Sequence, residues 1–139
     1  MRKPRVLFVC VGNSCRSQMA EGFARALGPH VLSAESAGLA PAPMVAPITR
    51  EIMIERDIDL SDHFPKGLDE IDLAGYDLVV NLSGYPLPLP VTAPVREWEV
   101  PDPIGAGRVF HERVARQVEE LVRNLIAELA PAPNQSGKR

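Results

Sequence analysis

Both cysteines of the chain lie in one short stretch that also holds an arginine and a serine. Residues 9–18 read VCVGNSCRSQ, with thiols at Cys10 and Cys15 and with Arg16 and Ser17 directly after them. A cysteine acts as a nucleophile in its thiolate form, which needs a positive environment. An arginine offers a planar fork of donors that matches two oxygens of a tetrahedral oxyanion. The spacing therefore favours a loop that holds an oxyanion against a sulfur nucleophile.

The backbone of this stretch is expected to supply most of the oxyanion-binding groups. Gly12 permits a positive φ or a close backbone approach, so the N–H groups of the loop can converge. The helix predicted to follow points its positive end into the same space. This field favours the thiolate form of Cys10, and Ser17 is placed to hydrogen-bond that sulfur. The predicted oxyanion-binding residues are Val11, Gly12, Asn13, Ser14, Cys15 and Arg16.

Other uses of the two thiols fit the sequence less well. A zinc site needs more ligands than two cysteines and three scattered histidines provide. A thioredoxin-like redox pair has two residues between its thiols, whereas Cys10 and Cys15 have four. A buried structural cysteine remains the plain alternative for Cys10 taken alone. The agreement of strand, loop and helix favours the oxyanion site, and we expect no metal and no cofactor.

Alternating strand and helix signals surround the loop. RVLFVC is a short apolar run that predicts a buried strand. Pro47 fits only the first turn of a helix, so a helix is predicted to begin just before it. The predicted order is a strand at 5–10, a helix at 16–27, a strand at 30–38, a helix beginning near Val45 or Ala46, strands at 76–83 and 95–100, and a helix at 107–129.

The short connections imply right-handed βαβ units and a parallel sheet. The predicted fold is α/β, with a four-stranded parallel sheet flanked by helices on both faces and the phosphate-binding loop after the first strand. Ligands of such sheets bind beyond the carboxyl ends of the strands, where this loop begins. We expect one domain over residues 1–130 and a polar, disordered tail at 131–139.

Composition narrows the class of protein. The chain has 139 residues, 45% of them hydrophobic and 24% charged, which suits one soluble globular domain. A net charge of −3 argues against a nucleic-acid partner. No apolar run is long enough to predict a membrane span, so we expect no membrane partner. Two cysteines do not make a disulfide framework, which favours a cytoplasmic location.

The motifs together resemble the low-molecular-weight protein tyrosine phosphatase superfamily, which includes thiol-coupled arsenate reductases. VLFVCVGNSCRSQMAEG is similar to the superfamily's signature loop, and SAESAGL, DIDLSDH, YDLVVNL and VPDP follow in the superfamily's order. The resemblance covers the chain to about residue 130. It implies a four-stranded parallel sheet, with Cys10 as the nucleophile, Arg16 as the oxyanion clamp and Asp102 as a general acid.

Further roles come from the same resemblance. A carboxylic acid on a loop can protonate a leaving oxygen, although the Asp-Pro pair at Asp102 is also typical of a simple turn. In relatives, groups matching Asn13, Ser36 and His63 hold the loop backbone by hydrogen bonds. Relatives also use the position of Cys15 to protect the nucleophile as a reversible disulfide, which makes Cys15 the expected redox partner.

Individual residues divide between the two activities of the superfamily. NSCRSQMAEG and REWEVPDP resemble the arsenate reductases, and Ile104 offers no aromatic wall for a phosphotyrosine ring. Ser83 and Tyr85, however, stand where related reductases carry further thiols. Lys66 stands where many of them use a carboxylate to bind potassium.

The sequence therefore favours hydrolysis of phosphate monoesters through a phosphocysteine at Cys10, because a phosphatase needs no second thiol. The alternative is an arsenate reductase regenerated by an external thiol: glutathione, mycothiol or a glutaredoxin-type protein. A non-catalytic phosphate-binding module fits less well, since binding alone needs no thiol. The expected partners are a phosphate or arsenate oxyanion, a phosphoprotein substrate and an external thiol.

Overall fold

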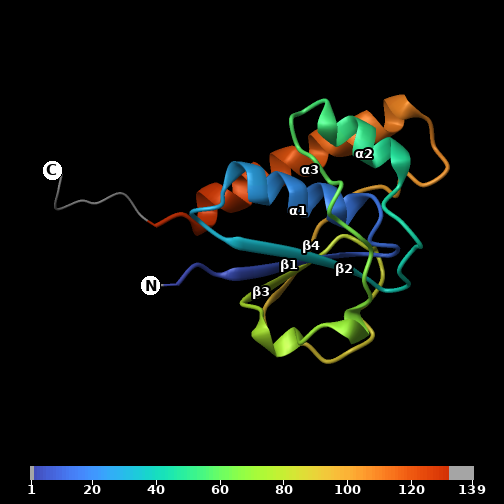
Figure 1. Cartoon of the computed structure of the whole chain (residues 1–139). Coiled ribbons are helices and arrows are strands. Elements are labelled where there is room, and N and C mark those ends of the chain that lie inside the picture. The colour runs from blue at the N-terminus through green and yellow to red at the C-terminus, as the bar shows by residue number, and fades with distance from the viewer. Residues whose placement is uncertain (1, 132–139) are drawn as a thin grey trace, which may run out of the picture.

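The computed structural model describes residues 2–131 and has the predicted parallel sheet (Figure 1). The strands pair in the order β2-β1-β3-β4, and each pairing is parallel. Most of the predicted tail, residues 132–139, lies outside the described residues. The strands are β1 (Arg5–Cys10), β2 (Ser33–Gly38), β3 (Leu78–Asn81) and β4 (Val95–Glu97).

Helices of two kinds cover the sheet. The α-helices are α1 (Arg16–Leu27), α2 (Pro47–Ile54) and α3 (Arg108–Leu129), and the one-turn 3-10 helices are η1 (Leu68–Glu70) and η2 (Leu73–Gly75). Pro47 is the first residue of α2, where its missing N–H costs no hydrogen bond. In residues 2–131, no helix is long and apolar enough to cross a membrane.

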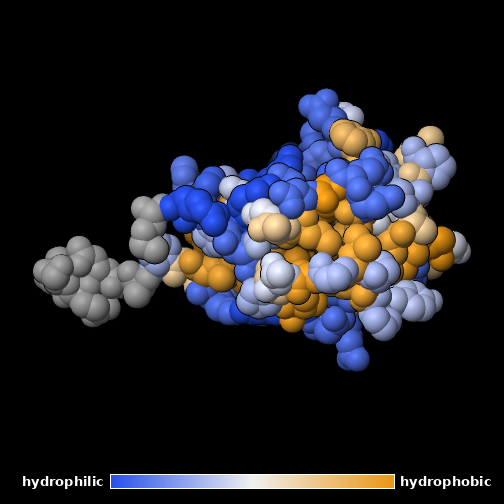
Figure 2. Space-filling view, turned by 90° about the horizontal axis from the view of Figure 1, so that it is seen from below, coloured by the Kyte–Doolittle hydropathy of each residue, from blue (hydrophilic) through white to orange (hydrophobic). Residues whose placement is uncertain are grey.

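The two faces of the sheet are covered unequally. Val6, Phe8 and Cys10 of the central strand β1 point to the face that α1, α2 and α3 cover, and they join the larger core cluster (Figure 1). Leu7 and Val9 alternate to the other face, as the two-residue period of a strand requires. That face is covered by η1, η2 and the apolar loop between β3 and β4, and hydrophobic residues gather on the surface seen there (Figure 2). The prediction of a sheet covered on both faces is confirmed, with 3-10 helices on the thinner side.

The strand register brings several chain segments to one edge of the sheet. Cys10 at the end of β1 pairs with Gly38 at the end of β2, and Val9 pairs with Asn81 at the end of β3. The loop of residues 11–15 and the segments that follow β3 and β4 therefore leave the sheet side by side. This edge is the carboxyl edge, where parallel α/β sheets bind ligands.

Candidate active site

The loop of residues 11–15, here called the oxyanion loop, turns its carbonyl groups outward. The carbonyl oxygens of Cys10, Val11 and Gly12 accept hydrogen bonds of 2.8–3.0 Å from backbone N–H groups within residues 39–42. That of Ser14 accepts one of 3.1 Å from the residue before α2. Within residues 2–131, the N–H groups of the loop donate to no protein acceptor. The first turn of α1 also has no side-chain cap, so its amides too can face an oxyanion.

Asn13 holds the unusual backbone position of this loop. Its φ of 52° lies in the left-handed region, which asparagine tolerates better than most residues. Gly12 has no positive φ, and a Cβ there would meet its nearest atom at an ordinary 3.5 Å. The structure thus uses neither of the two options that Gly12 offered, a positive φ or a close backbone approach, and the left-handed position falls on Asn13 one residue later.

The Asn13 side chain connects the loop to two other segments. Its Oδ1 accepts a 3.0 Å hydrogen bond from the N–H of Lys66. Its Nδ2 donates to Ser17 Oγ at 2.8 Å and to Ser36 Oγ at 2.9 Å. Ser36 lies in β2, so the amide ties the oxyanion loop to a strand, to α1 and to the segment that precedes η1. The structure thus brings the predicted pair Asn13 and Ser36 into direct contact.

Ser17 stands against the expected nucleophile. Cys10 Sγ lies 2.9 Å from Ser17 Oγ, and both residues are buried. Because Asn13 already donates to Ser17 Oγ, the hydroxyl proton of Ser17 is free to point at the sulfur. A donor aimed at sulfur stabilises the thiolate more than the thiol. The structure thus places Ser17 beside the sulfur, and its role in catalysis stays a prediction.

His63 reaches the loop only indirectly. Gln18 donates from Nε2 to the Asn13 carbonyl at 3.1 Å and to the Phe64 carbonyl at 3.3 Å. Its Oε1, an acceptor, lies 2.8 Å from His63 Nδ1, so Nδ1 carries the proton. Burial lowers the pKa of His63, and the carboxylate of Glu21 opposes that change. His63 therefore contacts Gln18, and Gln18 in turn contacts the loop. The sequence analysis did not predict this link through Gln18.

Glu21 is a further buried residue beside Ser36 and His63, and the sequence analysis did not predict its place in the site. It is 3% exposed, accepts a 2.5 Å hydrogen bond from Ser36 Oγ and forms a 2.6 Å ion pair with Arg25. A buried carboxylate is costly unless it is paired, and these two contacts provide the pairing. The signal in the sequence was only a glutamate one turn after Ser17 on α1, which is also typical of an exposed helix face.

Gly38 is a further position that sequence reasoning missed. A Cβ on this glycine would lie 2.7 Å from the carbonyl oxygen of Val11 and 2.9 Å from the amide nitrogen of Asn13. Both neighbours are backbone atoms of the oxyanion loop, so a side chain here has no space. The glycine at the end of SAESAG was the available signal, since glycine in a strand often marks a close backbone approach.

Arg16 and Asp102 meet at the mouth of the site. Arg16 is 4% exposed, and its Nη1 donates to the carbonyls of Leu82 at 2.6 Å and Val100 at 3.1 Å. Its Nη2 lies 3.5 Å from Asp102 Oδ2. Asp102 is half-exposed and its Oδ1 accepts from the N–H of Ile104 at 3.0 Å, as in an Asp turn. Val11, Arg16, Ser83, Gly84, Tyr85, Val100 and Asp102 line a pocket of about 470 Å³.

Cys15 is the last residue of the oxyanion loop, and like Cys10 it is buried. It directly precedes α1 and is 3% exposed. Burial raises the pKa of its thiol, and the hydroxyls of Thr49 and Ser14 act in the opposite direction. Cys15 is therefore a protonated thiol at neutral pH, which attacks a sulfur slowly. Its proposed pairing with Cys10 stays a prediction.

Ser83 and Lys66, two positions at which this chain differs from related arsenate reductases, each make contacts with residues near them in the chain. Ser83 Oγ donates to Asn81 Oδ1 at 2.7 Å and accepts from the N–H of Tyr85 at 3.0 Å, which shapes the turn after β3. The Lys66 ammonium lies 5.4 Å from the centre of the Phe64 ring, and Lys66 lines a small polar pocket of about 110 Å³. Within residues 2–131, no three His, Cys, Asp or Glu side chains are grouped as metal ligands.

Comparisons with known proteins agree with this architecture. A curated relative from Synechocystis, named glutaredoxin arsenate reductase, is 39% identical over 91% of this chain and 98% of its own length. An arsenate reductase from Staphylococcus xylosus is 36% identical over 89% of this chain and 97% of its own. A solved arsenate reductase in the phosphate-binding state aligns with a TM-score of 0.84 and 38% identity, over 91% of this chain and 99% of the other.

A tyrosine phosphatase also shares the fold. The low molecular weight protein tyrosine phosphatase from T. tengcongensis aligns with a TM-score of 0.76 and 33% identity, over 91% of this chain and all of the other. The family described as low molecular weight phosphotyrosine protein phosphatase matches residues 5–86, which include the oxyanion loop, α1 and β1 to β3. The chain therefore belongs to the low molecular weight phosphotyrosine protein phosphatase family.

Proposed function

We propose that this protein is an arsenate reductase that takes its electrons from an external thiol. The observation that carries the proposal is the near full-length match to curated arsenate reductases, one of them named for glutaredoxin. This reverses the preference that the sequence alone gave to phosphate-ester hydrolysis. Support for hydrolysis comes from the family itself and from a solved tyrosine phosphatase.

The first step uses the groups around the oxyanion loop. Arsenate is a tetrahedral oxyanion like phosphate, so the loop amides and the Arg16 guanidinium suit it equally. The Cys10 thiolate, assisted by the donor at Ser17, attacks arsenic and a sulfur–arsenic bond forms. An arsenate hydroxyl takes up a proton from solvent and leaves as water. The product is a Cys10–arsenic(V) adduct, and the fixed N–H dipoles stabilise its charge without reorganisation.

The second step transfers two electrons. An external thiolate attacks Cys10 Sγ and the sulfur–arsenic bond breaks. The bonding pair stays on arsenic, which leaves as arsenite, arsenic(III), and Cys10 is left in a mixed disulfide. A second external thiol attacks that disulfide and releases Cys10 as thiolate. Two thiols become one disulfide, which balances the reduction of arsenic by two electrons.

The chain's own second thiol suits this step poorly. Burial raises the pKa of the Cys15 thiol, which keeps it in the less nucleophilic thiol form at neutral pH. Ser83, at a position where related reductases carry a thiol, has a hydroxyl that cannot form a disulfide. An external donor is therefore needed for turnover, whereas Cys15 can protect an oxidised Cys10.

Phosphate-ester hydrolysis is the second candidate function, and one observation favours it. Asp102 lies 3.5 Å from Arg16 and lines the same 470 Å³ pocket, within reach of a leaving oxygen. The clamp and the acid thus line one pocket, and the nucleophile Cys10 directly precedes Val11, which lines it too. We expect hydrolysis as a weaker activity of the same site.

The two functions are separated by measuring both on one preparation. Arsenite release is followed with dithiothreitol, with glutathione and with glutaredoxin plus glutathione, beside turnover of nitrophenyl phosphate. We expect thiol-dependent arsenite release in the wild type and in Cys15→Ser, and none in Cys10→Ser. Ester turnover without arsenite release from any thiol would instead support the phosphatase.

A further inference from the structure

We propose that the groove beside the oxyanion pocket is the docking site for a thiol protein whose reactive cysteine is flanked by a lysine or arginine. The inference rests on the proposed function, since it identifies the class of electron donor. The groove, here called the β3–β4 groove, lies between residues 82–86 and residues 97–101. Its volume is about 810 Å³.

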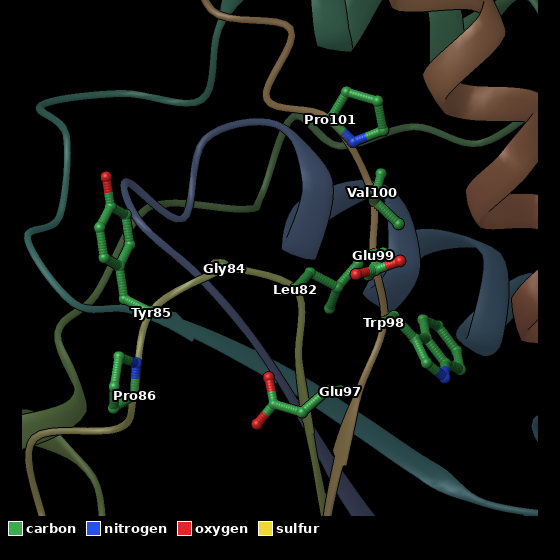
Figure 3. Close-up of a pocket in the computed structure, with 9 residues that line it drawn as sticks. All are labelled: Leu82, Gly84, Tyr85, Pro86, Glu97, Trp98, Glu99, Val100 and Pro101. Carbon is green, nitrogen blue, oxygen red and sulfur yellow. The ribbon is translucent and has the colours of Figure 1, made fainter.

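The walls of the groove come from the two segments that leave the sheet after β3 and β4. Figure 3 shows the Glu97 carboxylate pointing toward the segment that carries Pro86. The Trp98 ring lies on the other side of its strand, where it packs against Phe8 with ring centres 5.8 Å apart. Tyr85 is 62% exposed. The lining residues are Leu82, Gly84, Tyr85, Pro86, Glu97, Trp98, Glu99, Val100 and Pro101.

The groove is continuous with the oxyanion pocket. Gly84, Tyr85 and Val100 line both, so a molecule seated in the groove reaches the mouth of the site. Arg16 joins the two walls, because its Nη1 donates to the carbonyls of both Leu82 and Val100. A cysteine carried by a docked partner thus reaches the pocket that is lined by Val11, the residue after Cys10.

Charge selects the kind of donor. Glu97 and Glu99 are exposed on the groove, whereas the nearby Arg96 is engaged in an ion pair with Glu128. Arg16 is buried, and its guanidinium is engaged by the Leu82 and Val100 carbonyls and by Asp102, so the groove itself presents apolar surface with acidic groups. Glutathione carries two carboxylates and one ammonium and is repelled there. A protein with an apolar contact surface and a cation beside its cysteine is complementary.

The proposal is tested with a bacterial glutaredoxin that has a lysine beside its reactive cysteine, kept reduced by glutathione, glutathione reductase and NADPH. Arsenate-dependent NADPH oxidation is measured as glutaredoxin is varied. We expect Glu99→Lys to raise the KM for glutaredoxin about five- to tenfold at low salt, with the difference shrinking as salt screens the charges. Glu120→Lys, an equal charge change at an exposed site on α3, should keep the KM within about twofold.

A binding measurement separates docking from chemistry. Glutaredoxin with its reactive cysteine changed to serine is titrated calorimetrically into the phosphate-loaded protein, and Glu99→Lys should weaken binding by a similar factor. Unchanged binding and KM in Glu99→Lys, or full turnover with glutathione alone, overturns the docking inference and leaves the proposed function standing. Absence of arsenite release with every thiol overturns the proposed function, while the titration still tests the groove.

Discussion

Replacing Gly38 with alanine tests how closely the oxyanion loop is packed on β2. The new Cβ would lie 2.7 Å from the Val11 oxygen and 2.9 Å from the Asn13 nitrogen, so the loop or the end of β2 must move. The Val11 oxygen cannot move freely, because it accepts a 2.8 Å hydrogen bond from the Ala40 N–H. Overpacking of this kind costs about 1–3 kcal/mol, and the lower entropy of the unfolded alanine chain returns about half a kcal/mol.

The net cost of Gly38→Ala is thus about 0.5–2.5 kcal/mol, a fall in Tm of roughly 2–10 °C. The loss of function should be larger in proportion, since displacing catalytic groups by up to about 1 Å costs up to about 100-fold in rate. We expect kcat/KM for arsenate to fall about 10- to 100-fold and phosphate to bind more weakly. Tm is read by calorimetry and arsenite release by a coupled assay.

Gly107→Ala is the matched control for this substitution. A Cβ on Gly107 meets nothing within 4 Å, and the residue precedes α3 with a φ of −78°. Alanine is a poorer N-cap residue than glycine, but it also lowers the entropy of the unfolded chain, so the net cost should stay below about 1 kcal/mol, with activity unchanged. If Gly38→Ala matches Gly107→Ala in Tm and in phosphate affinity, the close approach of β2 does not control the geometry of the oxyanion loop.

Three other substitutions address single groups. Cys15→Ser should retain arsenite release but lose recovery by dithiothreitol after mild peroxide, when mass spectrometry should find sulfinic acid on Cys10 in place of a Cys10–Cys15 bridge. Asp102→Asn should lower ester turnover about 100-fold or more, most for poor leaving groups such as phenyl phosphate, and equal losses for all leaving groups would remove Asp102 from the acid role. Folding lowers the pKa of His63, so the folded state binds fewer protons than the unfolded state and stability should fall as pH drops below about 6.5. In His63→Gln that fall in the free energy of unfolding between pH 7 and pH 5 should be smaller, and identical urea titrations of the two proteins would contradict this account.

The sequence predicted those parts of the fold that depend on local patterns. The buried run before Cys10 and the helix after Arg16 were readable because strand and helix periods are local, and the order of elements then limited the topology. The cover on the thinner face was not predicted in detail. The one-turn helices η1 and η2 are too short to show a period, and the apolar loop before β4 has prolines but no regular pattern.

The contacts that complete the site depend on residues far apart in the chain. Gly38 matters because β2 pairs with β1 in one register, and a single sequence does not state that register. The contacts of Arg16 with the carbonyls of Leu82 and Val100 span 66 and 84 positions. The β3–β4 groove exists because these two segments leave neighbouring strands at the same edge. Hydrophobic periodicity does not predict contacts between distant segments. The resemblance to a known family therefore indicated Arg16 but not the carbonyl groups that it contacts.

Asn13 explains why the nucleophile depends on the whole edge of the sheet. Its Nδ2 has two protons and both are used, one on Ser17 and one on Ser36, while Oδ1 accepts from Lys66. Asn13 donates to one acceptor position of the Ser17 oxygen, which leaves the Ser17 proton free to point at Cys10. The orientation of the Ser17 donor therefore depends on the contacts of Asn13 with Ser36 and Lys66, which lie 23 and 53 positions further along the chain. A change that loosens β2 or the segment before η1 should thus reduce the reactivity of Cys10 even when the residues of the oxyanion loop are unchanged.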